Sequence, residues 1–242
     1  MPERVEILGL QVDRVNMEEV LQKTEEFIKD GGFHQVVTLG TEMAVTASYD
    51  KEFKEVINSA HLVVPDSVGI LWAAKKKGKV LSERVAGIDI IYRLSELAIK
   101  KGWSFYLLGA KPGIAEAAAE NLCKFREGLK IAGTHHGYFT DDAGVIEDIK
   151  RCKPDILLAA MGFPRQEKWI RNNREILGVP VCIGVGGSFD VLSGKLKRAP
   201  DIFIKLGLEW FYRFFKEPSR FQRLMALPKF MIMVYKEKLF RR

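Results

Sequence analysis

Apolar and polar residues follow two different periods along the first 195 residues of the chain. Residues 4 to 15 alternate with a period of two around Gly9, which predicts a short hairpin. From Asn16 onward, apolar residues recur at helical spacing until Gly31, so we expect a helix that Asn16 caps. Further along, short apolar runs alternate with helical stretches. These runs are His34 to Leu39, Leu62 to Pro65, Ser104 to Gly109, Leu129 to Thr134, Asp155 to Met161 and Val179 to Val185.

Several of these runs are apolar almost throughout, as is typical of strands in a parallel sheet that helices cover on both faces. Their alternation with helices predicts an α/β fold, a Rossmann-like sandwich with a mostly parallel central sheet and a small N-terminal hairpin. The composition changes near Leu196. We therefore expect a Rossmann-like core over residues 1–195 and a helical C-terminal appendage over residues 196–242.

The excess positive charge of the chain lies in this appendage. Residues 196–242 hold twelve Lys and Arg against four acidic residues, whereas residues 1–195 hold 26 basic and 27 acidic residues. Ten of the 25 aromatic residues also lie in the appendage. Basic residues interleaved with large apolar ones are typical of a segment that binds an anionic membrane surface.

Several other classes of protein are disfavoured by the sequence. Cys123, Cys152 and Cys182 lack the spacing of a zinc site or a disulfide framework, and the first ten residues lack the pattern of a signal peptide. Charged residues interrupt every apolar run before it reaches the roughly 20 residues that span a bilayer. We therefore expect a cytoplasmic protein that is peripheral on the inner face of the cell membrane. Exposed apolar faces of the appendage could also drive formation of a homo-oligomer.

Glycine-rich turns follow several predicted strands, at the edge of the sheet where such folds bind ligands. The turn 109–113 joins a strand to a helix, so its backbone N–H groups, the helix dipole and Lys111 suit a phosphate or diphosphate. Gly186-Gly187 is a second turn of this kind. Neither turn has the GxGxxG or the Walker spacing, which disfavours a nicotinamide enzyme and a P-loop ATPase. An ordinary tight turn is the alternative for both.

Two charged side chains in the first half of the chain are candidates for catalysis or substrate binding. Asp66 follows an apolar strand, where partial shielding from water would raise its pKa and suit a general base. The alternative is that Asp66 merely caps the helix that begins near Val68. Arg84 could clamp an anion, or it could pair with a structural carboxylate.

A third polar cluster begins a helix after the predicted strand 155–161. Arg165, Gln166 and Glu167 stand in its first turn, where Gln and Glu commonly serve as caps. The same geometry would let Gln166 reach a sugar hydroxyl. The chain has no Asp-x-Asp pair, and His135 and His136 have no further ligands at metal-binding spacing. We therefore expect neither a metal nor a cofactor.

Seven short motifs lie in order along the core. They are TLGTEM at 38–43, VVPDSVGILWAA at 63–74, ERVAGIDI at 83–90, LLGAKPG at 107–113, HGYF at 136–139, MGFPRQE at 161–167 and VGGSFD at 185–190. Together they resemble the bacterial WecG/TagA/CpsF glycosyltransferase family, and in particular its TagA-type members. The likeness covers roughly residues 10 to 195, and the appendage is also similar to that of the family.

This resemblance implies an inverting, metal-independent transfer of N-acetylmannosamine from its UDP donor. The acceptor would be the 4-hydroxyl of N-acetylglucosamine on undecaprenyl diphosphate, as in synthesis of the teichoic acid linkage unit. Asp66 matches the aspartate proposed as the general base of the family, and Thr38, Arg84 and Gln166 match further pocket positions. The residues implied in substrate binding are Gly109, Ala110, Lys111, Pro112, Gly113, Gly137, Tyr138, Gly162, Phe163, Pro164, Arg165, Glu167, Gly186, Gly187, Phe189 and Asp190.

The chain departs from the family pattern at two positions. Family members usually carry Asn where this chain has Gly40, and often Gly where it has Ser67. Gly40 removes a side-chain amide beside Thr38, and with it any acceptor contact that this amide makes.

The charge of the diphosphate suggests a second role for the appendage. Without a metal, helix N-termini and arginines must stabilise the negative charge that develops on the leaving group. The core offers few arginines beyond Arg84 and Arg165. We hypothesise that the appendage folds over the pocket and contributes Arg213, Arg220 or Arg223 to UDP or to the lipid diphosphate. The alternative is that these arginines only touch lipid headgroups.

Three other functions compete with this interpretation. A related transferase could use a different UDP-sugar, because donor identity depends on a few pocket atoms. A Rossmann-like oxidoreductase would lack its fingerprint loop. A non-enzymatic module could bind a membrane or nucleic acid, since aromatic residues among Lys and Arg suit single strands. The aliphatic residues of the appendage are useful only in lipid, so we expect no nucleic acid partner.

Overall fold

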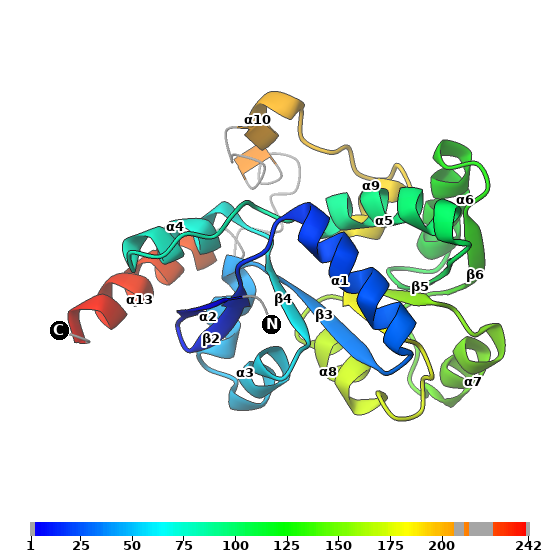
Figure 1. Ribbon diagram of the computed structural model, residues 1–242, viewed down its shortest axis with the longest axis horizontal. Coiled ribbons are helices and arrows are strands. Elements are labelled where there is room, and N and C mark those ends of the chain that lie inside the picture. The colour runs from blue at the N-terminus through cyan, green and yellow to red at the C-terminus, as the bar shows by residue number, and fades with distance from the viewer. Residues whose placement is uncertain (1–2, 206–210, 213–224, 241–242) are drawn as a thin grey trace.

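A six-stranded parallel sheet forms the centre of the computed structural model, which describes residues 3–205, 211–212 and 225–240 (Figure 1). The strand order is β4-β3-β8-β7-β5-β6, and neighbouring strands are parallel throughout. The predicted α/β fold is therefore confirmed, with strand ends shifted by one or two residues. The strands are β3 (His34–Leu39), β4 (Leu62–Pro65), β5 (Ser104–Gly109), β6 (Lys130–His135), β7 (Ile156–Ala160) and β8 (Val181–Gly184).

The predicted N-terminal hairpin is also present, as β1 (Arg4–Ile7) and β2 (Leu10–Asp13). A fully buried carboxylate ties it to the edge of the main sheet. Oδ2 of Asp13 accepts a hydrogen bond from the backbone N–H of Val63 at 2.7 Å, and Oδ1 accepts one from Nε of Arg4 at 2.8 Å. Burial raises the pKa of Asp13, and these two partners oppose the rise. The hairpin is thus joined to β4 by a paired, hydrogen-bonded charge.

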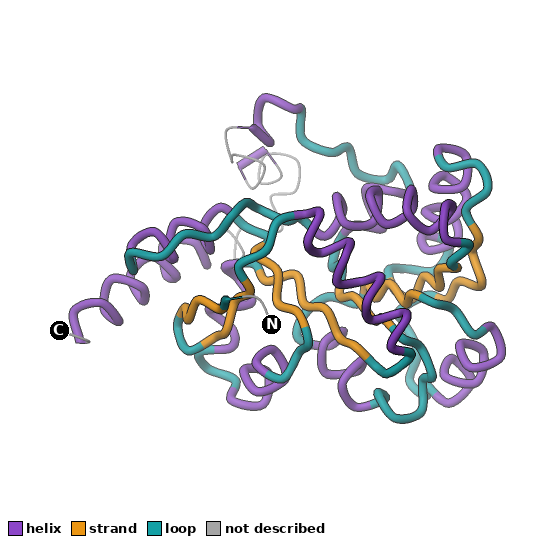
Figure 2. The backbone as a smooth tube through the Cα atoms, viewed as in Figure 1, coloured by secondary structure: helices purple, strands orange, loops and turns teal. Residues whose placement is uncertain are grey.

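Helices cover both faces of the sheet (Figures 1 and 2). The helices packed on one face are α1 (Met17–Asp30), α5 (Gly87–Lys101), α6 (Ile114–Phe125) and α9 (Ser188–Leu192). Those on the other face are α2 (Thr41–Ala47), α3 (Lys51–Asn58), α7 (Ala143–Cys152) and α8 (Arg165–Asn172). Three further helices are α4 (Val68–Lys76), α10 (Asp201–Lys205) and α13 (Ala226–Phe240).

The first helix shows how the sequence sets an element boundary. Asn16 accepts a hydrogen bond from the backbone N–H of Glu19, and the Glu19 side chain accepts one from the backbone N–H of Asn16. This capping box satisfies two N–H groups that the helix itself cannot pair. The helix ends at Gly31, which adopts the left-handed conformation that glycine allows. Both predicted ends of α1 are confirmed.

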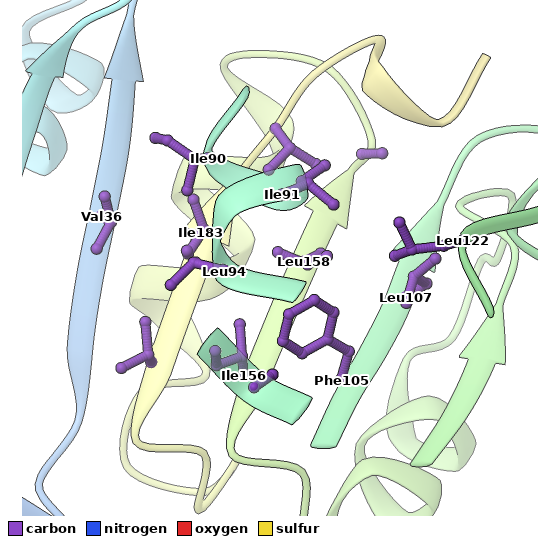
Figure 3. Packing of buried hydrophobic residues seen from close by; sticks show 14 of the residues in the cluster. Val36, Ile90, Ile91, Leu94, Phe105, Leu107, Leu122, Ile156, Leu158 and Ile183 are labelled. Carbon is purple, nitrogen blue, oxygen red and sulfur yellow. The ribbon is translucent and has the colours of Figure 1, made fainter. Parts of the chain in front are cut away.

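Alternate strand residues supply the two apolar layers. Phe105, Leu107 and Leu158 point to the layer of α5 and α6, where Leu158 lies near Ile91 and Leu94, and Leu107 lies beside Leu122 (Figure 3). The residues between them on the strands point to the opposite layer. Since side chains alternate across a strand, a strand that is apolar throughout feeds both layers.

Part of the predicted appendage packs into this core. Helix α13 contacts α2 and α4 and lies alongside α4 in Figure 1. Phe230 and Val234 are buried in the same apolar cluster as strand β3. Glu237 forms an ion pair with Lys77 at 2.9 Å and accepts a hydrogen bond from the backbone N–H of Leu8 at 3.3 Å. None of the helices within the described residues is long and apolar enough to cross a membrane.

We predict that Phe230→Ala lowers the free energy of unfolding by about 3 kcal/mol, because it empties a fully buried site. Ile232→Ala is the matched control, since Ile232 lies on the same helix and is 56% exposed. The control should change stability by less than about 0.5 kcal/mol. Urea denaturation of both variants measures the difference. Equal losses in the two variants would contradict the docking of α13.

Candidate active site

A pocket of about 610 Å³ opens at the carboxyl edge of the sheet. Its walls come from the segments that follow β3, β4, β5, β6, β7 and β8, together with Leu227 of α13. Parallel strands end at one edge, so segments far apart in the sequence meet there. A pocket of this size is within the range that binds small-molecule ligands.

Most of the residues predicted for the site line this pocket. Those that do are Thr38, Asp66, Arg84, Gln166, Ala110, Lys111, Gly137, Tyr138, Gly162, Phe163, Arg165, Gly186, Gly187, Phe189 and Asp190. Five others are not among the lining residues, namely Gly109, Pro112, Gly113, Pro164 and Glu167. Arg213, Arg220 and Arg223 lie outside the described residues.

Asp66 is placed in the pocket by the end of β4. Its backbone N–H donates to the carbonyl of Leu39 at 3.0 Å, which extends the pairing of the two strands. The residue that caps α4 is Ser67, whose hydroxyl accepts a hydrogen bond from the backbone N–H of Ile70 at 3.4 Å. The capping role that would have explained Asp66 therefore belongs to its neighbour. Ser67, a departure from the family pattern, has a structural reason as a preferred N-cap residue.

Thr38 reaches the pocket from the end of β3. Its hydroxyl donates to the carbonyl of Gly184 at 2.8 Å, and the residue is 6% exposed. This bond uses the only hydrogen of the hydroxyl. The Thr38 oxygen can therefore only accept a hydrogen bond from a ligand. Gly40 stands at the N-cap of α2, and a Cβ built there would meet no atom within 4 Å. The position therefore has room for a larger side chain, such as that of Asn.

Gln166 and Glu167 begin α8 behind the pocket. Oε1 of Gln166 accepts a hydrogen bond from the backbone N–H of Gly162 at 3.1 Å, and Nε2 donates to Oε1 of Glu167 at 2.7 Å. Glu167 is fully buried. Burial raises the pKa of its carboxyl to about 7, against the hydrogen bond from Gln166, which lowers it. Glu167, predicted as a substrate contact, therefore points into the protein.

The turn after β5 brings two strand ends close together. Gly109 has a φ of +142°, and a Cβ on it would lie 2.5 Å from the carbonyl carbon of Ala160. Only glycine permits this approach. The next residue, Ala110, donates its backbone N–H to the Ala160 carbonyl at 2.9 Å. The turn thus fixes β5 against β7, and of its residues Ala110 and Lys111 line the pocket.

Both signs of charge line the pocket. The basic residues are Arg84, Lys111, Arg165 and Lys195, and the acidic ones are Glu42, Asp66 and Asp190. Arg165 lies with its guanidinium 5.0 Å from the ring centre of Phe139, and Nζ of Lys195 pairs with Asp190 at 3.1 Å. Within the described part of the chain, no group of three or more His, Cys, Asp or Glu side chains is arranged to hold a metal ion.

Comparison with known proteins decides the family. The family model described as "Glycosyl transferase WecG/TagA/CpsF family" matches residues 5–242. This chain belongs to that family. The resemblance carried by the seven motifs is therefore confirmed, and the chain is a glycosyltransferase.

Two relatives in the family are named as N-acetylglucosaminyldiphosphoundecaprenol N-acetyl-beta-D-mannosaminyltransferases. The protein of Bacillus subtilis (strain 168) is 37% identical over 203 residues, which cover 84% of this chain and 79% of the relative. The protein of Staphylococcus aureus (strain MW2) is 34% identical over 238 residues, which cover 97% of this chain and 93% of the relative.

Lys195 and Leu227 are among the residues of this glycosyltransferase pocket that the sequence did not predict. Lys195 was taken as the last residue of the core, although its place five residues after Asp190 could have indicated an ion pair at the site. Leu227 lies in the predicted appendage, yet it lines the pocket, and a Cβ on Gly69 would lie 3.4 Å from its Cδ1. The described part of the appendage thus contributes an apolar wall to the pocket.

The buried carboxyl of Glu167 should make stability depend on pH. Its pKa is near 4.5 in the unfolded chain and about 7 in the folded protein, so the folded state binds its proton more tightly. The stabilisation is complete below pH 4.5 and is lost as the pH rises to about 7. Relative to Glu167→Gln, which does not titrate, the wild-type protein should lose about 3 kcal/mol over this window. Urea denaturation at pH 5 and pH 8 measures this difference, and parallel pH dependences would contradict it.

Proposed function

We propose that this chain transfers N-acetylmannosamine from UDP-N-acetylmannosamine to the 4-hydroxyl of N-acetylglucosamine on undecaprenyl diphosphate. The acceptor is supported by the names of the two relatives, which contain both the acceptor and the sugar transferred. The single observation that carries the chemistry is the position of Asp66, which lines the pocket while Ser67 caps the neighbouring helix. The product would be the disaccharide linkage unit of wall teichoic acid.

The proposed reaction proceeds by inversion. The Asp66 carboxylate accepts the proton of the acceptor hydroxyl, and the hydroxyl oxygen attacks the anomeric carbon of the donor. The bond from that carbon to the UDP oxygen breaks on the opposite side, and the electron pair leaves with UDP. General base catalysis of this kind typically contributes a factor of about 10² to 10⁴ in rate.

The negative charge that develops on the diphosphate needs positive partners. Lys111, Arg84, Arg165 and Lys195 line the pocket and are the described residues that could supply them. The Gly186-Gly187 turn adds backbone N–H groups, which suit phosphate oxygens. We propose that this set works without a metal, and that Arg213, Arg220 or Arg223 adds to it from the appendage.

We further propose that α13 faces the anionic inner surface of the cell membrane. Ile232 and Tyr235 are exposed on it, and Met225 is exposed just before its first residue. Nζ of Lys229 lies 4.4 Å from the ring centre of Tyr49, and Nζ of Lys76 lies 5.6 Å from that of Tyr235. Exposed apolar and basic side chains on one surface suit the boundary between headgroups and acyl chains. In the absence of a membrane, the same surface is our candidate for self-association.

Asp66→Asn should lower kcat by about 10² to 10⁴-fold, because the amide cannot accept the proton. The assay combines the purified protein with UDP-N-acetylmannosamine and a lipid-diphosphate N-acetylglucosamine analogue, and mass spectrometry follows the disaccharide. Asp30→Asn is the control, since Asp30 is exposed and ends α1, just before the amino end of β3 and away from the pocket. Unchanged turnover in Asp66→Asn would overturn the general base. Turnover with another UDP-sugar alone would favour a related transferase.

Ile232→Glu combined with Tyr235→Glu should weaken binding to anionic liposomes by about tenfold or more, because it puts two charges on the proposed membrane surface. Phe125→Glu is the matched control, since Phe125 is 73% exposed at the end of α6, away from α13. Liposome flotation measures both. Equal binding by the double variant and the control would mean that this face of α13 does not contact the membrane.

A further inference from the structure

The carboxyl of Glu167 is fully buried behind the pocket, and only one of its two oxygens is hydrogen-bonded to another side chain. Oε1 accepts from Nε2 of Gln166 at 2.7 Å, and Oε2 has no partner among the described residues. The backbone carbonyl of Glu167 is held by Nε2 of Gln35 at 3.0 Å, and Gln35 is itself buried. The helix start is therefore fixed without the carboxyl.

An incompletely paired buried carboxyl is costly for the fold. Removing an acid from water without full hydrogen bonding disfavours the charged form, and an apolar side chain of similar volume would avoid that penalty. Structural need therefore does not account for an acid at this position. Its one described side-chain partner is Gln166, which lines the pocket.

The contacts of Gln166 assign the two ends of its amide. The backbone N–H of Gly162 can only donate, so it must face the amide oxygen. The Glu167 oxygen faces the amide nitrogen and accepts one of its two hydrogens. The second N–H and one lone pair of the oxygen are left for other partners. Without the carboxyl, the amide would keep only the contact with Gly162.

Gly184 packs against the same pair of side chains, Gln166 and Glu167. A Cβ on Gly184 would lie 2.7 Å from both Nε2 of Gln166 and Oε1 of Glu167, so this hydrogen-bonded pair packs directly on the end of β8. The carbonyl of Gly184 accepts the hydroxyl of Thr38. The amide of Gln166 is thus held between a buried acid and the strand that also anchors Thr38.

We propose that Glu167 is a positioning residue, which orients the Gln166 amide so that its remaining N–H donates to an oxygen of the bound substrate. That oxygen belongs to a sugar hydroxyl or to the diphosphate, both of which accept such a bond. The inference deepens the proposed function and rests on it. Glu167 itself touches no substrate and acts only through Gln166.

A double-mutant cycle tests this directly. Glu167→Met removes the acceptor with little change in volume, and it should lower kcat/KM by about tenfold or more. Glu167→Gln can still offer an amide oxygen to Gln166, and it should stay within about threefold of the wild-type protein. In a Gln166→Ala background, Glu167→Met should cause no further loss. Equal losses in the two backgrounds would overturn the proposal, because a general structural effect does not depend on Gln166.

Gly184→Ala offers an independent route if Glu167→Met fails to fold. The new methyl group would displace the same hydrogen-bonded pair from the side of β8, so its effect on kcat/KM should also vanish in the Gln166→Ala background. Asp13→Asn is the matched control. It alters another fully buried carboxyl, which is not among the pocket-lining residues, and should change stability without changing kcat.

The same experiment distinguishes failure of the proposed function from failure of the positioning role of Glu167. If the wild-type protein transfers no N-acetylmannosamine, the proposed function fails before the cycle begins. If the wild-type protein is active and Asp66→Asn is not, additive effects of Glu167 and Gln166 overturn the positioning role alone.

Discussion

The site depends on the parallel pairing of the central strands. Because every strand of the central sheet runs in the same direction, the segments after all six of these strands, β3 to β8, meet at one edge. Asp66, Thr38 and Gln166 lie at or after the ends of three different strands. They meet at this edge although they are far apart in the sequence. The glycine turns serve the same arrangement. Gly109 allows the end of β5 to approach Ala160 closely, and a side chain at Gly109 would push β5 and β7 apart.

A second constraint operates beneath the pocket, at Gly184. The carbonyl of this residue anchors Thr38, and the absence of a side chain leaves room for the pair Gln166 and Glu167. One glycine therefore sets the positions of two pocket side chains that come from different elements, Thr38 from β3 and Gln166 from α8. Such a site is preorganised by backbone groups, which move less than side chains on a surface loop. This arrangement buries the carboxyl of Glu167, and burial raises its pKa to about 7.

Much of the fold and of the pocket could be predicted because the signals are local. Apolar runs marked all six strands, and Asn16, as the expected cap, marked the start of α1. Local signals could not show whether Asp66 or Ser67 caps α4, because both residue types are preferred at N-caps. They fail again at Glu167, since a first-turn acid reads as a solvated cap unless the packing around Gly184 is known. Leu227 was missed because only tertiary contacts bring it to the pocket, whereas Lys195 had a local signal in its spacing from Asp190.

Helix α13 shows why composition alone could not assign the role of the appendage. It is apolar on more than one face, so periodicity gives no direction for its packing. In the structure one face carries Phe230 and Val234 into the core, while Ile232 and Tyr235 remain exposed. The ion pair between Glu237 and Lys77, with both side chains mostly buried, fixes the helix on the core. The exposed face is thereby held in a set orientation to the pocket wall at Leu227. If that face lies on the membrane, the geometry of the core determines where a lipid-linked acceptor meets Asp66.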